Sequence, residues 1–97
     1  MDKLKMVNVR LVEDRTLYSS IAIRNPSDAV EIMRNELSQY DREVMCILNL
    51  DSKHRVINVN IASIGSINAA LIEPREIFKA SILSNADSLF LMHNHPS

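Results

Sequence analysis

Glycine, cysteine and aromatic residues are scarce in this chain, and each scarcity excludes a class of function. The single glycine, Gly65, rules out a glycine-rich phosphate-binding loop. The single cysteine, Cys46, cannot form a disulfide within the chain, which favours a reducing cytoplasm. Two tyrosines, two phenylalanines and no tryptophan leave little aromatic surface on which nucleic-acid bases would stack.

Long apolar runs and an excess of one charge are also missing. No apolar stretch approaches the roughly 20 residues that a membrane-spanning helix needs, and the charged start at Met1–Lys5 lacks a signal-peptide core. With 11 basic and 12 acidic residues, the net charge of -1 lacks the positive footprint typical of nucleic-acid binding. We therefore expect one small cytoplasmic domain with no membrane partner, since 46% apolar residues suit a folded core.

The first half of the chain carries two strand patterns and one helix pattern. Val7–Val12 alternates apolar and polar residues, which predicts a strand, and Leu17–Ile23 predicts a second short one. Asn25 and Pro26 are typical of a helix cap and a first helical residue. The helix is expected to run to about Gln39, on an apolar stripe formed by Val30, Met33, Leu37 and Tyr40.

The second half predicts a sheet with a helix inserted before its last strand. Glu43–Leu50 is apolar on both alternating faces, which is typical of a central strand covered on both sides. Arg55–Ser63 alternates and is expected to pair with it as a hairpin. Pro74–Asn85 predicts a second helix, and Ser88–Met92 a short strand. This order predicts a layered α/β domain of the α+β type, with helices flanking the sheet.

Two histidines separated by one residue follow the last predicted strand. Because residues two apart in a strand share a face, His93 and His95 converge and can chelate zinc, while Asn94 points away. The alternative is a pair of surface histidines at a strand end, since a catalytic zinc needs three protein ligands. His54 is the remaining histidine, and we interpret it as a solvated turn residue.

Three motifs together resemble a known family. "EVM" from Glu43, "PRE" from Pro74 and "HNHPS" from His93 to Ser97 are similar to the RadC-like branch of the JAB1/MPN+ (JAMM) metalloprotease superfamily. The resemblance implies a cytidine-deaminase-like fold, a mixed β-sheet flanked by helices. It covers residues 26–97, the N-terminal part of a JAB/MPN domain, and leaves residues 1–25 as a strand-containing N-terminal segment.

The resemblance also implies roles for individual residues. His93 and His95 correspond to zinc ligands, Glu43 to the general base, and a third ligand, an aspartate, is expected beyond Ser97. Zinc would acidify a water molecule that attacks a peptide or isopeptide bond in a substrate of unknown identity. Without the resemblance, Glu43 has the simpler interpretation of a solvated glutamate, and Cys46 that of a small buried apolar residue.

Because the sequence stops at Ser97, within the family's motif, we expect an incomplete domain. It is a trimmed piece of a longer protein, a deliberate cut at an expected boundary, or a natural short homologue. We therefore expect little hydrolysis and weak zinc binding by these residues alone. We also expect self-association into a homo-oligomer through the exposed edge of the last strand. The alternatives are a DNA-repair-associated or DNA-binding accessory protein, suggested by the family name alone, and a non-catalytic interaction scaffold.

Overall fold

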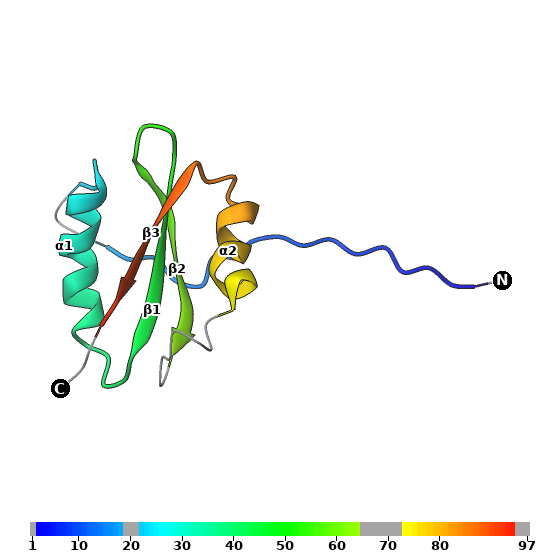
Figure 1. Cartoon of the computed structure of the whole chain (residues 1–97), viewed down its shortest axis with the longest axis horizontal. Coiled ribbons are helices and arrows are strands. Elements are labelled where there is room, and N and C mark those ends of the chain that lie inside the picture. Colours follow the sequence, from blue (N-terminus) through cyan, green and yellow to red (C-terminus); the bar gives the residue numbers. More distant parts are fainter. Residues whose placement is uncertain (1, 19–21, 65–72, 95–97) are drawn as a thin grey trace.

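The protein folds as a three-stranded antiparallel sheet between two helices. The computed structural model describes residues 2–18, 22–64 and 73–94. The elements follow in the order α1 (Pro26–Leu37), β1 (Val44–Leu50), β2 (Val56–Ile64), α2 (Pro74–Leu83) and β3 (Ser88–His93). The helices lie on opposite faces of the sheet (Figure 1), so the predicted α+β fold is confirmed. Neither described helix has the length and apolar character needed to cross a bilayer.

Helix α1 begins where the capping residues predict. The Asp28 backbone N–H donates to Asn25 Oδ1 at 3.0 Å, and Pro26 occupies the first turn. The helix ends at Leu37, two residues before the expected Gln39. Its buried side comprises Ala29, Ile32, Met33 and Leu37, while Val30 of the predicted stripe is half-buried.

Strand β1 lies in the middle of the sheet and is covered on both faces, as predicted. The strand order is β2-β1-β3, and both pairings are antiparallel. Because β2 and β3 both oppose β1, they run in the same direction, and α2 joins them by crossing one face of the sheet. The sheet is thus antiparallel between all hydrogen-bonded neighbours in the described residues, where the family resemblance implied a mixed one. The core against α1 includes the β1 residues Val44, Cys46, Leu48 and Leu50.

Helix α2 ends in a turn that directs the chain into β3. Asn85 adopts a left-handed conformation with φ 53°. The Asn85 N–H donates to the Ile82 carbonyl and the Ala86 N–H to the Ser81 carbonyl, each at 3.1 Å. This is the Schellman arrangement, which satisfies the last carbonyls of a helix. β3 then starts at Ser88, opposite Leu50 of β1.

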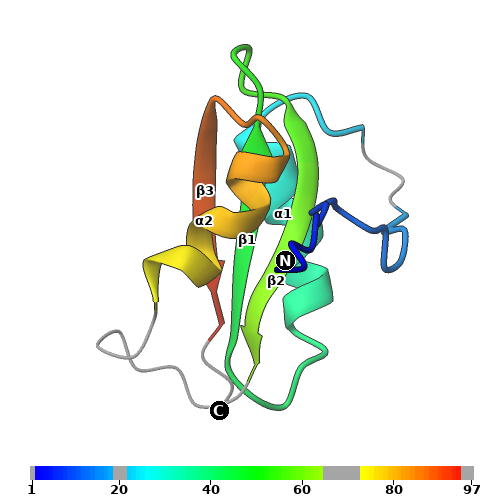
Figure 2. The same cartoon turned by 90° about the vertical axis from the view of Figure 1, so that its right-hand side faces the viewer.

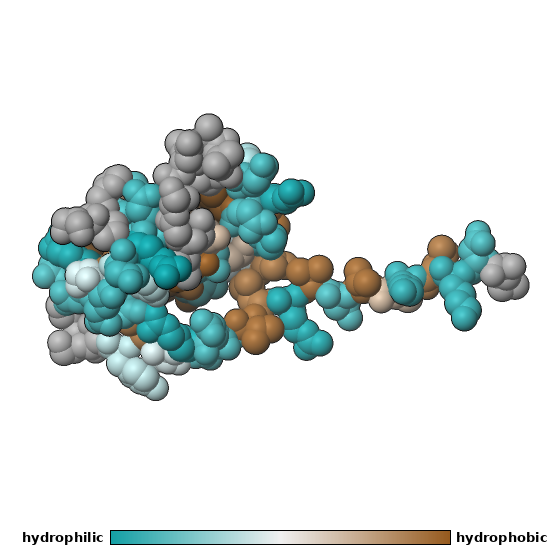
Figure 3. All heavy atoms as spheres, turned by 90° about the horizontal axis from the view of Figure 1, so that it is seen from below, coloured by the Kyte–Doolittle hydropathy of each residue, from teal (hydrophilic) through white to brown (hydrophobic). Residues whose placement is uncertain are grey.

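The prediction of a strand at Val7–Val12 is wrong. Residues 2–18 contain neither helix nor strand, and Val7 and Val9 are 80% and 69% exposed. The N-terminal residues extend away from the body as a chain of alternating apolar and polar side chains (Figures 1 and 3). Alternation suits a strand, but a strand also needs a neighbour to pair with. The second strand, predicted at Leu17–Ile23, is absent from its described residues, and residues 19–21 fall outside the described part of the chain.

Candidate functional site

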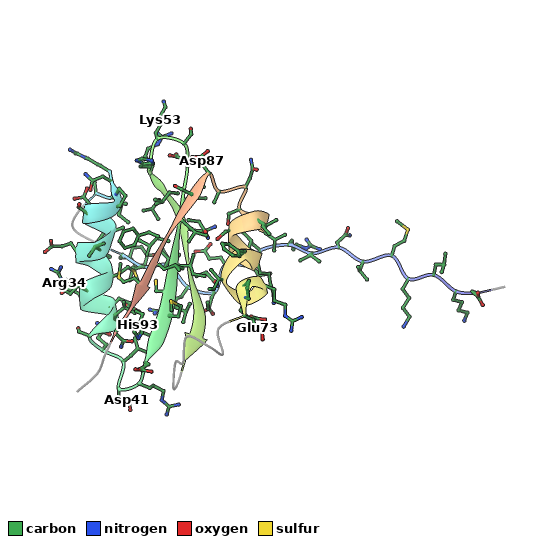
Figure 4. The ribbon with its side chains drawn as sticks, in the orientation of Figure 1. Arg34, Asp41, Lys53, Glu73, Asp87 and His93 are labelled. Carbon is green, nitrogen blue, oxygen red and sulfur yellow. The ribbon has the colours of Figure 1, made fainter. Side chains whose placement is uncertain are left out.

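The candidate site lies at the end of the sheet where β1 begins and β3 ends. Met45 of β1 pairs with His93 of β3, and the antiparallel ladder runs from there to Leu50 and Ser88 at the opposite end. Glu43 directly precedes β1, and His93 is the last residue of β3. Figure 4 shows His93 at the end of the molecule away from Lys53 and Asp87. The fold thus brings Glu43 and His93, far apart in the sequence, to one end.

Both residues also belong to one face of the sheet. Directly opposed residues of an antiparallel pair point to the same side, so His93 shares a face with Met45. Alternation along the extended chain places position 43 on that side as well. It is the face covered by α2, since Asn49, four residues after Met45, accepts a hydrogen bond from Ser81 of α2. Glu43 and His93 are each half-buried, so the site has partial access to solvent.

The N-terminal end of α2 lies at this same end of the sheet. Figure 2, turned by 90°, shows the start of α2 and the end of β3 together at the lower side of the molecule, and Figure 4 places Glu73 there too. Asp41 and Arg42 form an exposed ion pair with 3.5 Å between Oδ1 and Nε, immediately before Glu43. Exposed charged groups therefore lie beside Glu43 and His93 at this end of the sheet.

Asn94 makes the bonds that join the two strand ends here. Its Oδ1 accepts from the Val44 N–H at 2.6 Å, and its own N–H donates to the Val44 carbonyl at 3.4 Å. Its Nδ2 donates to the carbonyls of Leu37 and Arg42 at 3.3 and 3.2 Å. The side chain therefore points toward α1, away from the face that carries His93, as predicted. Sequence reasoning missed its role because Leu37, Arg42 and Val44 are all distant in the sequence.

Cys46 is not part of this chemistry. The thiol is free and fully buried, on the face of β1 that packs against α1. Burial raises the pKa of Cys46 to about 12, and the negative charge of Glu36 adds to the effect. A thiol that stays protonated at neutral pH is neither a nucleophile nor a metal ligand. The interpretation of Cys46 as a small apolar core residue is confirmed.

Two of the residues expected to form a metal site lie in the described part of the chain. One imidazole, from His93, and one carboxylate, from Glu43, share an end and a face, which fits a ligand and a neighbouring base. Residues 2–18, 22–64 and 73–94 contain no group of three or more ligating side chains that could hold a metal ion. The second predicted ligand, His95, lies outside the described residues, as do Pro96 and Ser97. His54 is an exposed turn residue at the far end of the sheet, as predicted.

Comparison with known proteins identifies the family. The model of the family described as "RadC-like JAB domain" matches residues 23–97. The chain belongs to this family. Curated relatives named UPF0758 proteins are similar to it: one from Finegoldia magna is 40% identical over 83 residues, which is 86% of this chain and 37% of that protein. One from Roseiflexus castenholzii is 40% identical over 75 residues, 77% of this chain and 32% of that protein.

A third relative, from Clostridium acetobutylicum, is 34% identical over 80 residues, which is 82% of this chain and 35% of that protein. The chain thus spans about a third of the length of the relatives that it matches. The resemblance carried by Glu43, Pro74 and the "HNHPS" motif is confirmed at the level of the family.

Proposed function

We propose that this RadC-like JAB domain contributes the base and two metal ligands of a zinc-dependent hydrolase that cleaves peptide or isopeptide bonds. The pairing of Met45 with His93 carries the proposal, because it places Glu43 and a histidine at one end and on one face of the sheet. An extended chain would bring His95 to the face of His93 and opposite position 43. A third ligand, an aspartate, would come from residues beyond Ser97 in the whole protein.

In this proposal, each residue has one task. His93 and His95 would hold the ion through their imidazole nitrogens. The ion, when bound, would supply acidity to a water molecule and polarisation of the scissile carbonyl. Glu43 accepts a proton from the attacking water and returns it to the leaving amine. Glu43 is half-buried directly before β1, so this residue keeps partial access to solvent, as the proposed role requires.

The test separates metal binding from catalysis. Glu43→Gln in a protein that continues beyond Ser97 should keep stoichiometric zinc and lose hydrolysis by about 10²-fold or more, the contribution typical of a general base. His93→Ala and His95→Ala should lose the zinc itself, as measured by elemental analysis. Glu31→Gln on the exposed side of α1 and His54→Ala in the hairpin turn are the matched controls. A Glu43→Gln variant with full activity would disprove the assignment of the base.

A further inference from the structure

The two peptide groups on either side of Glu43 are both hydrogen-bonded to the side chain of Asn94. The carbonyl of Arg42 belongs to the peptide unit before Glu43, and the N–H of Val44 belongs to the unit after it. Asn94 Nδ2 donates to the Arg42 carbonyl at 3.2 Å, and Asn94 Oδ1 accepts from the Val44 N–H at 2.6 Å. Since these two units contain both rotatable backbone bonds of Glu43, the amide of Asn94 restrains the conformation of that residue.

Asn94 also links the segment around Glu43 to helix α1 and strand β3. Nδ2 also donates to the carbonyl of Leu37, the last residue of α1, at 3.3 Å. The Asn94 backbone follows His93 directly and donates to the Val44 carbonyl at 3.4 Å. Asn94 therefore connects the end of α1, the start of β1 and the end of β3 at one point.

Asparagine suits this position because its amide carries an acceptor and two donors at once. An ionised aspartate would keep the acceptor for the Val44 N–H but lose both donors. Alanine would lose every side-chain bond and leave the N–H of Val44, a residue with 0% exposure, without its 2.6 Å acceptor.

We propose that Asn94 is a positioning residue that holds Glu43 at a fixed place relative to His93. This inference rests on the proposed function, in which Glu43 exchanges a proton with a water molecule held beside His93. A proton acceptor works only within hydrogen-bond reach of its donor. A displacement of about 1 Å at a reacting group can cost about 10²-fold in rate. Asn94 contacts neither substrate nor metal in this scheme; it acts through the backbone of Glu43.

The first experiment measures amide hydrogen exchange by NMR in this chain. In Asn94→Ala, exchange at Val44 should accelerate by at least about tenfold while exchange at Leu48, in the middle of β1, stays unchanged. Asn94→Asp should retain protection at Val44, because it keeps the acceptor. Asn58→Ala, which removes an asparagine with two side-chain hydrogen bonds elsewhere in the sheet, is the control and should leave Val44 unchanged. Unchanged exchange at Val44 in Asn94→Ala, or equal acceleration at Val44 and Leu48, would overturn the proposal.

The second experiment uses Co²⁺ alone as a probe, followed by its absorption spectrum, in a protein that continues beyond Ser97. Asn94→Ala and Glu43→Gln should both bind Co²⁺ as tightly as the original protein, because Glu43 is not a metal ligand in the proposed function. Both should shift the pH dependence of the spectrum, because the base beside the bound water is displaced in one variant and removed in the other. Asn58→Ala should match the original protein in affinity and in pH dependence. A shift in Glu43→Gln without a shift in Asn94→Ala would overturn the positioning role. If Glu43→Gln itself gives no shift, the proposed role of Glu43 fails, and exchange at Val44 alone then decides whether Asn94 restrains the backbone of Glu43.

If Asn94→Ala does not fold, Asn94→Asp replaces it. Because aspartate lacks both Nδ2 donors, the carbonyl ¹³C resonances of Leu37 and Arg42 should shift while the Val44 N–H stays protected. Unshifted carbonyl resonances would overturn the proposal.

Discussion

Ser81 Oγ donates a 2.5 Å hydrogen bond to Asn49 Oδ1 across the interface between α2 and the central strand β1. Asn49 is 0% and Ser81 7% exposed, so this is a buried polar pair in a small domain. The network continues through Asn49 Nδ2 to Asn58 Oδ1 at 2.7 Å, and from Asn58 Nδ2 to Ser84 Oγ at 2.8 Å. Polar bonds therefore tie α2 to both β1 and β2, whereas α1 is attached mainly by apolar packing.

Ser81→Ala should destabilise the domain, because it leaves the buried Asn49 Oδ1 without its donor. Such an unsatisfied group costs about 1–3 kcal/mol in the free energy of unfolding, measurable by urea denaturation. Ser52→Ala, at an exposed serine of the hairpin turn, is the control and should lie within about 0.5 kcal/mol of the original chain. Equal losses in the two variants would show that the Asn49–Ser81 bond contributes nothing.

Most of the fold could be predicted because its signals are local. Asn25 and Pro26 mark the start of α1 through capping chemistry that involves only neighbouring residues. The continuous apolar run of β1 reflects cover on both faces, which two helices provide. The prediction failed at Val7–Val12, where the pattern is equally local but no partner strand pairs with it in the described residues.

The candidate site could be predicted only in part, for the same reason. The motif at His93 and the family resemblance pointed to Glu43, and the register of β1 and β3 places both at one end of the sheet. The sequence contains no local signal for Asn94, because its four hydrogen bonds join segments that only the folded chain brings together. A residue that works by linking distant backbone groups becomes visible only in three dimensions.

Removing residues 1–12 should leave the stability of this chain almost unchanged. Leu4, Met6, Val7 and Val12 are 80% exposed or more, so their loss removes little buried surface. The truncated chain should keep Arg15. Its guanidinium contacts Glu36 in α1 and the hydroxyl of Tyr40, which follows α1. Thermal unfolding followed by circular dichroism would check this. A marked drop in Tm, or a change in the oligomeric state, would instead show that the N-terminal residues are buried in solution.

Cys46 should be inert in the folded protein. Since burial raises the pKa of its thiol to about 12, the thiolate that reacts with disulfide reagents is scarce at pH 8. The fully buried position also blocks access of the reagent. We expect slow modification by a thiol-reactive dye in buffer and rapid modification in concentrated urea. Rapid modification under native conditions would show that the core between β1 and α1 opens readily.

Asp51 should make the stability of the hairpin depend on pH under acidic conditions. Its Oδ1 accepts from the N–H groups of Lys53 and Arg55 at 2.8 and 2.9 Å, and its Oδ2 pairs with Arg55 Nε at 2.9 Å. The bond from the Arg55 backbone N–H lowers the pKa of Asp51 below its ordinary value of 3.8; desolvation opposes this, while the Lys53 N–H and the Arg55 side chain add to the lowering.

Because the pKa of Asp51 is lower in the folded state, the unfolded chain binds more protons in the acidic window. The stabilisation is therefore complete above pH 3.8 and is lost as the pH falls from there through the folded-state pKa. Asp51→Asn should be less stable than the original chain at pH 7, and the difference should shrink toward the acidic end of a urea-denaturation series. Asp41→Asn, at a side chain that is 91% exposed, is the matched control and should follow the original chain at every pH. A constant difference between Asp51→Asn and the original chain across the series would mean that the charge of Asp51 does not stabilise the turn.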